Sequence, residues 1–334
     1  MNNHLILKIA YAMHKLSFYY CSVLFYTKDN YKKTSKSIII NFLEFIKVLF
    51  KALIKCSKIF NSNSGYYEYI EIPITTKCSM KCKACSNLIP YYQKPCDIDT
   101  KILLDSIDVF IKCINNIVYV RVLGGEPLLS NNLYSTISKL LETDKIQRIE
   151  IVTNGTIIPK DEELVKILSN SRITISISQY PNVNREPLIA FLKNKKINYR
   201  IDKMNFWMEY GNIEKRNKSL KELKRQFKKC NHICKSLLKG NLHMCPRSSH
   251  GTDLGIINDN AEDYVNLLDT NITIDEKKKL INELLNKKYI IACDYCDFAT
   301  NKCKKIPVAE QFLLRPDVAN RAWKWVTFLL TFLI

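Results

Sequence analysis

The stretch CSMKCKAC, residues 78–85, decides the fold of this chain, together with GGEP at residues 124–127. Cys78, Cys82 and Cys85 have the spacing C-x3-C-x2-C. Three thiolates in one loop can hold three irons of a [4Fe-4S] cluster, and the missing fourth ligand leaves one iron open to a small molecule. A closed structural metal site would need four ligands, so a partial zinc knuckle is the competing interpretation.

The cysteine loop followed by Gly-Gly-Glu-Pro resembles the radical S-adenosylmethionine (radical SAM) enzymes over residues 67–205. The resemblance implies that the open iron chelates S-adenosylmethionine and that an electron entering the cluster cleaves this cofactor to methionine and a 5'-deoxyadenosyl radical. That radical would then abstract a hydrogen atom from the substrate. It also implies a flavodoxin or ferredoxin as electron donor and a cofactor site that includes Gly124, Gly125, Glu126 and Pro127.

Short runs rich in β-branched residues alternate with helical segments from residue 67 onward, a pattern typical of a parallel α/β sheet. We predict strands at 67–75, 117–123, 146–153, 172–178 and 197–201, and helices at 100–113, 131–142, 161–168 and 185–193. Each motif follows a strand, as in folds whose functional loops leave the carboxyl ends of parallel strands. The order resembles the partial (β/α)6 barrel of the radical SAM family.

Two polar residues at strand ends, Asn154 and Ser178, are candidate cofactor contacts by the same resemblance. Many family members carry an aromatic residue at the position of Ala84, so adenine stacking at that position is not predicted. A bulky side chain at Gly125 is expected to weaken S-adenosylmethionine binding and to spare the cluster, because glycine allows a close backbone approach.

A second cysteine array follows a basic helical stretch at residues 218–229. It resembles the auxiliary iron-sulfur modules called SPASM and, in shorter form, twitch. The preferred ligands of one auxiliary [4Fe-4S] cluster are Cys230, Cys245, Cys293 and Cys296, with Cys234 or Cys303 as substitutes. A tetrahedral zinc site is the alternative for two separated cysteine pairs.

The 334 residues carry a net charge of +19 and 13 cysteines. The positive charge is concentrated in residues 1–66, which contain ten lysines and only two acidic residues. This distribution does not indicate nucleic-acid binding. Residues 38–60 form a basic amphipathic pattern with lysines at 47, 51, 55 and 58. Such a helix either lies on an anionic membrane or packs on its own domain. The apolar end, residues 323–334, is shorter than the roughly 20 residues that a membrane span needs.

The predicted organisation is a basic helical extension (1–66), a radical SAM partial barrel (67–215), an auxiliary cluster domain (216–310) and an apolar tail (311–334). Clustered cysteines on a long chain favour reduced thiolates in the cytoplasm, with attachment to the inner face of the membrane as a further hypothesis. The resemblance implies oxidation or epimerisation of a carbohydrate or polyol, for example in surface polysaccharide assembly. A peptide-modifying enzyme is the alternative, and a non-catalytic iron-sulfur or zinc protein is the alternative of another class. No catalytic side chain is singled out.

Overall fold

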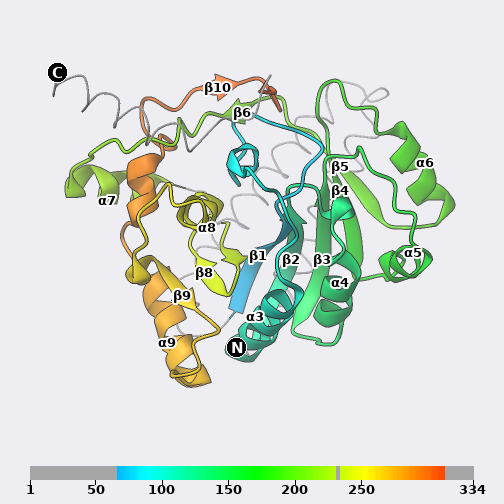
Figure 1. Ribbon diagram of the computed structural model, residues 1–334, viewed down its shortest axis with the longest axis horizontal. Coiled ribbons are helices and arrows are strands. Elements are labelled where there is room, and N and C mark those ends of the chain that lie inside the picture. The colour runs from blue at the N-terminus through cyan, green and yellow to red at the C-terminus, as the bar shows by residue number, and fades with distance from the viewer. Residues whose placement is uncertain (1–65, 231–233, 313–334) are drawn as a thin grey trace, which may run out of the picture. The chain divides into compact units, whose positions relative to one another are not determined.

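The computed structural model describes residues 66–230 and 234–312, which form a mixed α/β fold around one large sheet (Figure 1). Five of its strands run parallel and lie side by side in chain order. They are β1 (Tyr66–Thr75), β2 (Asn116–Gly124), β3 (Ile146–Thr153), β4 (Ile173–Ser178) and β5 (Tyr199–Asp202). The five predicted strands are therefore confirmed, with ends that differ by two residues or fewer.

Four helices connect these strands, namely α3 (Thr100–Cys113), α4 (Leu133–Leu141), α5 (Glu162–Leu168) and α6 (Glu186–Asn194). They confirm the predicted helices. Parallel strands joined in chain order require crossovers of one hand, so the helices gather on one face of the sheet. Asp99 and Asp161 cap α3 and α5, where each carboxylate accepts a hydrogen bond from the backbone N–H three residues later.

The core lies between this sheet and its helices. Along β1, Ile70, Ile72 and Ile74 are buried and belong to the same apolar cluster as Ile107 and Phe110 of α3. Alternate residues of a strand point to opposite faces. The residues between the isoleucines, including Glu71, therefore point to the opposite, inner face of the sheet.

Three further strands extend the sheet beyond β1. Strand β7 (Ser236–Leu238) pairs parallel to β1, and β8 (Asn241–His243) and β9 (Tyr264–Asn266) continue antiparallel. Helix α9 (Ile274–Leu285) contacts α3 and β9. The region predicted as an auxiliary module thus shares a sheet with the barrel strands, and the proposed boundary at residues 215–216 stays a prediction.

The open side of the sheet ends at β5 in the part of the chain that the structure describes. The architecture is a partial barrel, as predicted, with five parallel strands in barrel order. A separate two-stranded sheet pairs β6 (Trp207–Met208) with β10 (Lys305–Ile306). The remaining elements are η2 (Ile89–Tyr91), η3 (Pro127–Leu129), α7 (Leu220–Lys229), α8 (Pro246–Asp253), η4 (Ala261–Asp263) and η5 (Ile291–Tyr295).

The basic amphipathic segment (38–60) lies outside the described residues, and so does the predicted tail (311–334) except for Gln311 and Phe312. His232, a neighbour of the second cysteine array, also lies outside them. Within residues 66–230 and 234–312, we find no helix with the length and apolar character that crossing a bilayer requires.

Candidate active site

The two motifs meet at the carboxyl ends of β1 and β2. The Gly125 N–H donates to the carbonyl of Thr75 at 2.9 Å, and the Glu126 N–H donates to the carbonyl of Lys77 at 2.7 Å. A Cβ at Gly125 would stand 2.1 Å from the Lys77 carbonyl oxygen and 2.8 Å from Cys78 Cβ. The cysteine loop therefore occupies the space that a side chain at Gly125 would need. The expectation that a substitution at Gly125 spares the cluster stays a prediction, and the contact with Cys78 Cβ favours the opposite outcome.

The three cysteines of the loop line one cavity of about 370 Å³. Of the other residues predicted for the cofactor site, Gly124, Gly125, Asn154 and Ser178 also line this cavity, which we call the thiol cavity. Glu126 and Pro127 are not among its lining residues. Both are buried behind it.

Glu126 ties the ends of two strands together. Its carboxylate accepts hydrogen bonds from the Leu128 N–H at 3.1 Å, from Thr153 Oγ1 at 2.8 Å and from the Asn154 N–H at 2.8 Å. Burial raises the pKa of Glu126 to about 7, although these three donors favour the charged form. The Glu126 carboxylate thus supports the loops that line the thiol cavity.

Asn154 connects the end of β3 to the cysteine loop. Its Nδ2 donates to Ser79 Oγ at 3.0 Å and lies 3.8 Å from Cys78 Sγ. Burial raises the pKa of Cys78 to about 12 and the pKa values of Cys82 and Cys85 to about 11. These thiols remain protonated until a metal displaces the protons. Three thiols that line one cavity with the glycine backbone of residues 124–125 fit a three-ligand cluster with an open iron.

A row of charged side chains that the sequence analysis missed crosses the inner face of the sheet. Glu71, Arg121 and Glu150 are register neighbours on β1, β2 and β3. Arg121 Nη1 lies 3.4 Å from Glu71 Oε1, and Arg121 Nε lies 3.7 Å from Glu150 Oε2. Arg200 extends this charged row, since its Nη2 lies 3.1 Å from Glu150 Oε2 and its Nε 3.1 Å from Asp202 Oδ1. In the sequence, this row was indicated only by charged residues within strands that are rich in β-branched residues.

Glu71 and Arg121 of the charged row also line the thiol cavity. Aromatic side chains line it as well, namely Tyr180, Phe206, Trp207 and Tyr210. Tyr180 packs edge-on against Trp207 with ring centroids 5.5 Å apart. The cavity therefore combines thiols, a compensated ion pair and aromatic surfaces.

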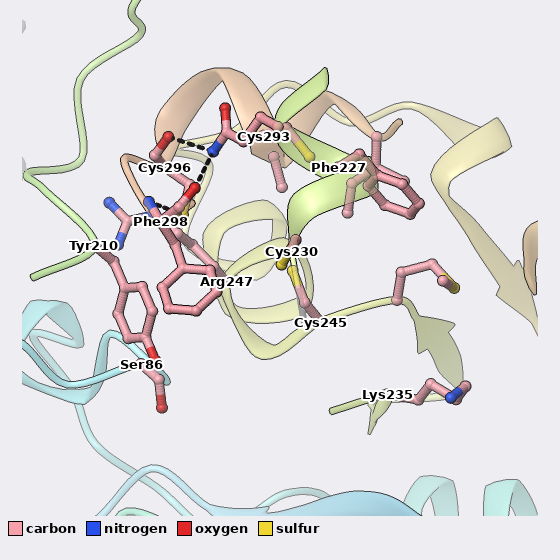
Figure 2. Close-up of a pocket in the computed structure, with 14 residues that line it drawn as sticks. Ser86, Tyr210, Phe227, Cys230, Lys235, Cys245, Arg247, Cys293, Cys296 and Phe298 are labelled. Carbon is pink, nitrogen blue, oxygen red and sulfur yellow. Dashed lines mark hydrogen bonds between the residues drawn. The ribbon is translucent and has the colours of Figure 1, made fainter. Parts of the chain in front are cut away.

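A second cavity, the auxiliary cavity, contains the preferred ligands of the second array (Figure 2). Cys230 follows α7, Cys245 caps the N-terminus of α8, and Cys293 and Cys296 lie in and directly after η5. All four line this cavity of about 180 Å³. The substitute ligands are not among its lining residues, and Cys234 Sγ instead forms a hydrogen bond with the hydroxyl of Tyr69 on β1.

Buried and half-buried polar side chains that the sequence did not reveal hold the loop around η5. Lys218 Nζ donates to the carbonyls of Cys293, at 2.8 Å, and Cys296. Gln226 Nε2 donates to the Cys296 carbonyl at 2.8 Å, and Arg247 Nε donates to the Tyr295 carbonyl at 2.8 Å. Two cationic groups therefore stand beside the thiols, where a thiolate-ligated cluster would carry negative charge.

The two cavities adjoin, because Ser86 and Tyr210 line both of them. Ser86 directly follows Cys85 of the cysteine loop, and Tyr210 lies between β6 and α7. A molecule in the thiol cavity would have the auxiliary cavity as its neighbour.

Comparison with known proteins identifies the domain. Residues 72–234 match the family model described as the Radical SAM superfamily. GTP 3',8-cyclase of Limosilactobacillus fermentum is 28% identical over 137 residues, which are 39% of each chain. GTP 3',8-cyclase of Alkaliphilus metalliredigens is 36% identical over 110 residues, 33% of this chain and 34% of the relative. The chain thus matches less than half the length of these curated relatives.

Among solved structures, anSMEcpe with bound AdoMet and the Kp18Cys peptide has a TM-score of 0.42 at 15% identity, covering 77% of this chain and 95% of that one. BtrN in complex with AdoMet and 2-DOIA has a TM-score of 0.40 at 16% identity, covering 74% and 97%. The cysteine loop, the Gly-Gly-Glu-Pro loop that packs on it and the family match agree, and residues 72–234 are a domain of the radical SAM superfamily, whose members use a [4Fe-4S] cluster and S-adenosylmethionine.

Proposed function

We propose that this protein removes a hydrogen atom from a carbon of a carbohydrate or polyol and thereby oxidises or epimerises it. The observation that carries the proposal is the thiol cavity itself, which joins the three cysteines to a compensated ion pair and aromatic walls. A neutral polyhydroxylated ring needs both donors and acceptors for its hydroxyl groups and an apolar surface for its face. The thiol cavity offers both.

In this proposal Cys78, Cys82 and Cys85 hold three irons of the cluster and leave the fourth to S-adenosylmethionine. When bound, the cluster supplies the electron that splits S-adenosylmethionine into methionine and a 5'-deoxyadenosyl radical. Gly124 and Gly125 offer backbone to the cofactor, and Asn154 and Ser178 offer polar side chains from the neighbouring strand ends. The buried walls exclude water from the reacting carbon.

The charged row favours a neutral or cationic substrate over a polyphosphate. Its carboxylates, Glu71, Glu150 and Asp202, outnumber the guanidinium groups of Arg121 and Arg200. A triphosphate would meet no excess of positive charge from this row. The reaction named for the curated relatives is thus a separate alternative, to be tested with GTP.

We further propose that residues 216–310 form a module whose four cysteines at the auxiliary cavity hold a second [4Fe-4S] cluster. The support is that all four line one cavity and that Lys218, Gln226 and Arg247 fix the surrounding backbone. The shared wall of Ser86 and Tyr210 puts this cavity next to the substrate. A cluster there would accept an electron from a substrate radical or help to orient the substrate.

The test is anaerobic reconstitution of the full chain, metal analysis and reduction with dithionite or reduced flavodoxin. We expect 5'-deoxyadenosine to form, and deuterium to pass into it from a deuterated polyol or sugar. Transfer only from a peptide, or conversion of GTP, would replace the proposed substrate class. Zinc as the bound metal would refute the cluster assignment.

Arg121→Met separates substrate binding from cofactor cleavage. Loss of the guanidinium should lower substrate-dependent turnover at least tenfold and leave substrate-independent cleavage of S-adenosylmethionine within about twofold, because the ion-pair partners of Arg121 are Glu71 and Glu150. The matched control is Arg225→Met on the exposed face of α7, which should change neither rate. Equal turnover of both variants would exclude the charged row from the substrate site.

A further inference from the structure

The cysteine loop is held by a segment more than 200 residues away in the sequence. Residues 308–312, which we call the strap, run antiparallel to residues 81–83, with Cys82 opposite Gln311 (bridge). The Lys83 N–H donates to the Glu310 carbonyl at 2.7 Å, and the Phe312 N–H donates to the Lys81 carbonyl at 2.8 Å. In Figure 1 the segment that follows β10 and the loop that follows β1 lie at the same end of the sheet.

Gln311 is the residue of the strap that reaches a cysteine sulfur. Its Oε1 accepts a hydrogen bond from the Lys81 N–H at 2.6 Å, and its Nε2 donates to Cys82 Sγ at 3.1 Å. The same Nε2 lies 2.5 Å from the carbonyl of Ala309, which fixes the orientation of the amide. Cys82 is 8% exposed, so water has little access to compete for its sulfur.

Hydrogen bonds to the sulfur ligands are among the properties that set the reduction potential of an iron-sulfur cluster. A donor to a thiolate stabilises the reduced, more negative form more than the oxidised form. Val308 and Ala309 are buried with Cys82 in a small apolar cluster, which holds the strap in place beside the loop.

We propose that Gln311 is a positioning residue for the cysteine loop, whose amide donates to the Cys82 sulfur and raises the reduction potential of the cluster bound there. This inference rests on the proposed assignment of the three cysteines as cluster ligands. It adds a contact that their spacing does not contain.

The test compares Gln311→Met with the parent by an EPR-monitored redox titration of the reconstituted full chain. The signal that changes on addition of S-adenosylmethionine identifies the cluster with the open iron. We expect Gln311→Met to lower the equilibrium constant for reduction by about three- to tenfold, where tenfold corresponds to ~59 mV for one electron. Gln311→Glu keeps the acceptor for the Lys81 N–H and should lower it at least as much, because it also adds negative charge.

The matched control is Glu310→Gln, which removes the ion pair between Glu310 and Lys83 on the same strap and leaves the amide at Cys82 intact. Its potential should equal that of the parent. Loss of iron from Gln311→Met alone also supports the assignment, since it shows that the contact holds the ligand loop.

An unchanged potential in Gln311→Met, or an equal change or equal iron loss in Glu310→Gln, would overturn the inference. If the parent protein holds the cluster, either of these results refutes only the proposed role of Gln311. A parent that holds no cluster at these cysteines would instead refute the proposed function.

Discussion

Replacing Gly125 with alanine tests the packing of the two motif loops with the smallest possible change. The new Cβ would stand 2.1 Å from the Lys77 carbonyl oxygen, whereas ordinary contact begins at 3.4 Å, so this carbonyl must move by about 1 Å. The movement breaks the 2.7 Å hydrogen bond from the Glu126 N–H. Leaving that buried donor unpaired costs about 1–3 kcal/mol, and overpacking adds about 1–3 kcal/mol. We therefore expect Gly125→Ala to destabilise the metal-free protein by about 2–6 kcal/mol.

The control is Gly255→Ala. Gly255 has φ +67° and open space around its Cβ position. Alanine there would therefore be destabilised only by the left-handed backbone conformation, which costs about 1–2 kcal/mol. Urea unfolding of the reduced, metal-free protein followed by circular dichroism gives both values, and iron is counted after reconstitution. Gly125→Ala should bind much less iron because Cys78 Cβ lies 2.8 Å from the new methyl group. A loss of stability no greater than that of Gly255→Ala, with normal iron, would refute this account of the loop.

Four further predictions concern the two metal sites, Glu126 and the basic segment. Changing all three loop cysteines (Cys78, Cys82 and Cys85) to alanine should remove about half the iron and all S-adenosylmethionine cleavage. Lys218→Met should selectively weaken the second cluster, whereas the control Lys221→Met should not. Iron contents that stay at the parental level would contradict both predictions. Burial raises the pKa of Glu126 from 4.5 to about 7, so between these two pH values the folded state keeps a proton that the unfolded state releases. The resulting contribution to stability is fully present below pH 4.5 and is lost as the pH rises through 7. Urea unfolding at pH 5 and pH 8 should show a loss of roughly 3 kcal/mol in the parent that Glu126→Gln lacks, and parallel pH profiles would exclude this carboxyl as the cause. Anionic liposomes at low salt should bind the full chain, and the protein should float with them, whereas a variant with the four lysines of residues 47–58 changed to glutamine should not. If the parent protein does not bind, these lysines have no role at a membrane.

The sequence by itself determined the strands, the helices and the place of the motifs. Runs such as 146–153 and 173–178 alternate with segments of helical period, and both periodicities come from local backbone geometry. Two consecutive glycines before Glu126 predicted a close approach of backbone. The contact of Gly125 with the cysteine loop could not be predicted, because that loop follows a different strand.

Only the tertiary structure decided which distant groups meet. The charged row depends on the register of five parallel strands, and a register cannot be read from one strand at a time. Four of the six cysteines in the second array share a cavity, while Cys234 turns to Tyr69 through the pairing of β7 with β1. Gln311 reaches Cys82 because the strap returns across the open end of the sheet after β10. Local periodicity specifies elements from neighbouring residues, whereas these contacts arise from packing between segments that the sequence keeps far apart.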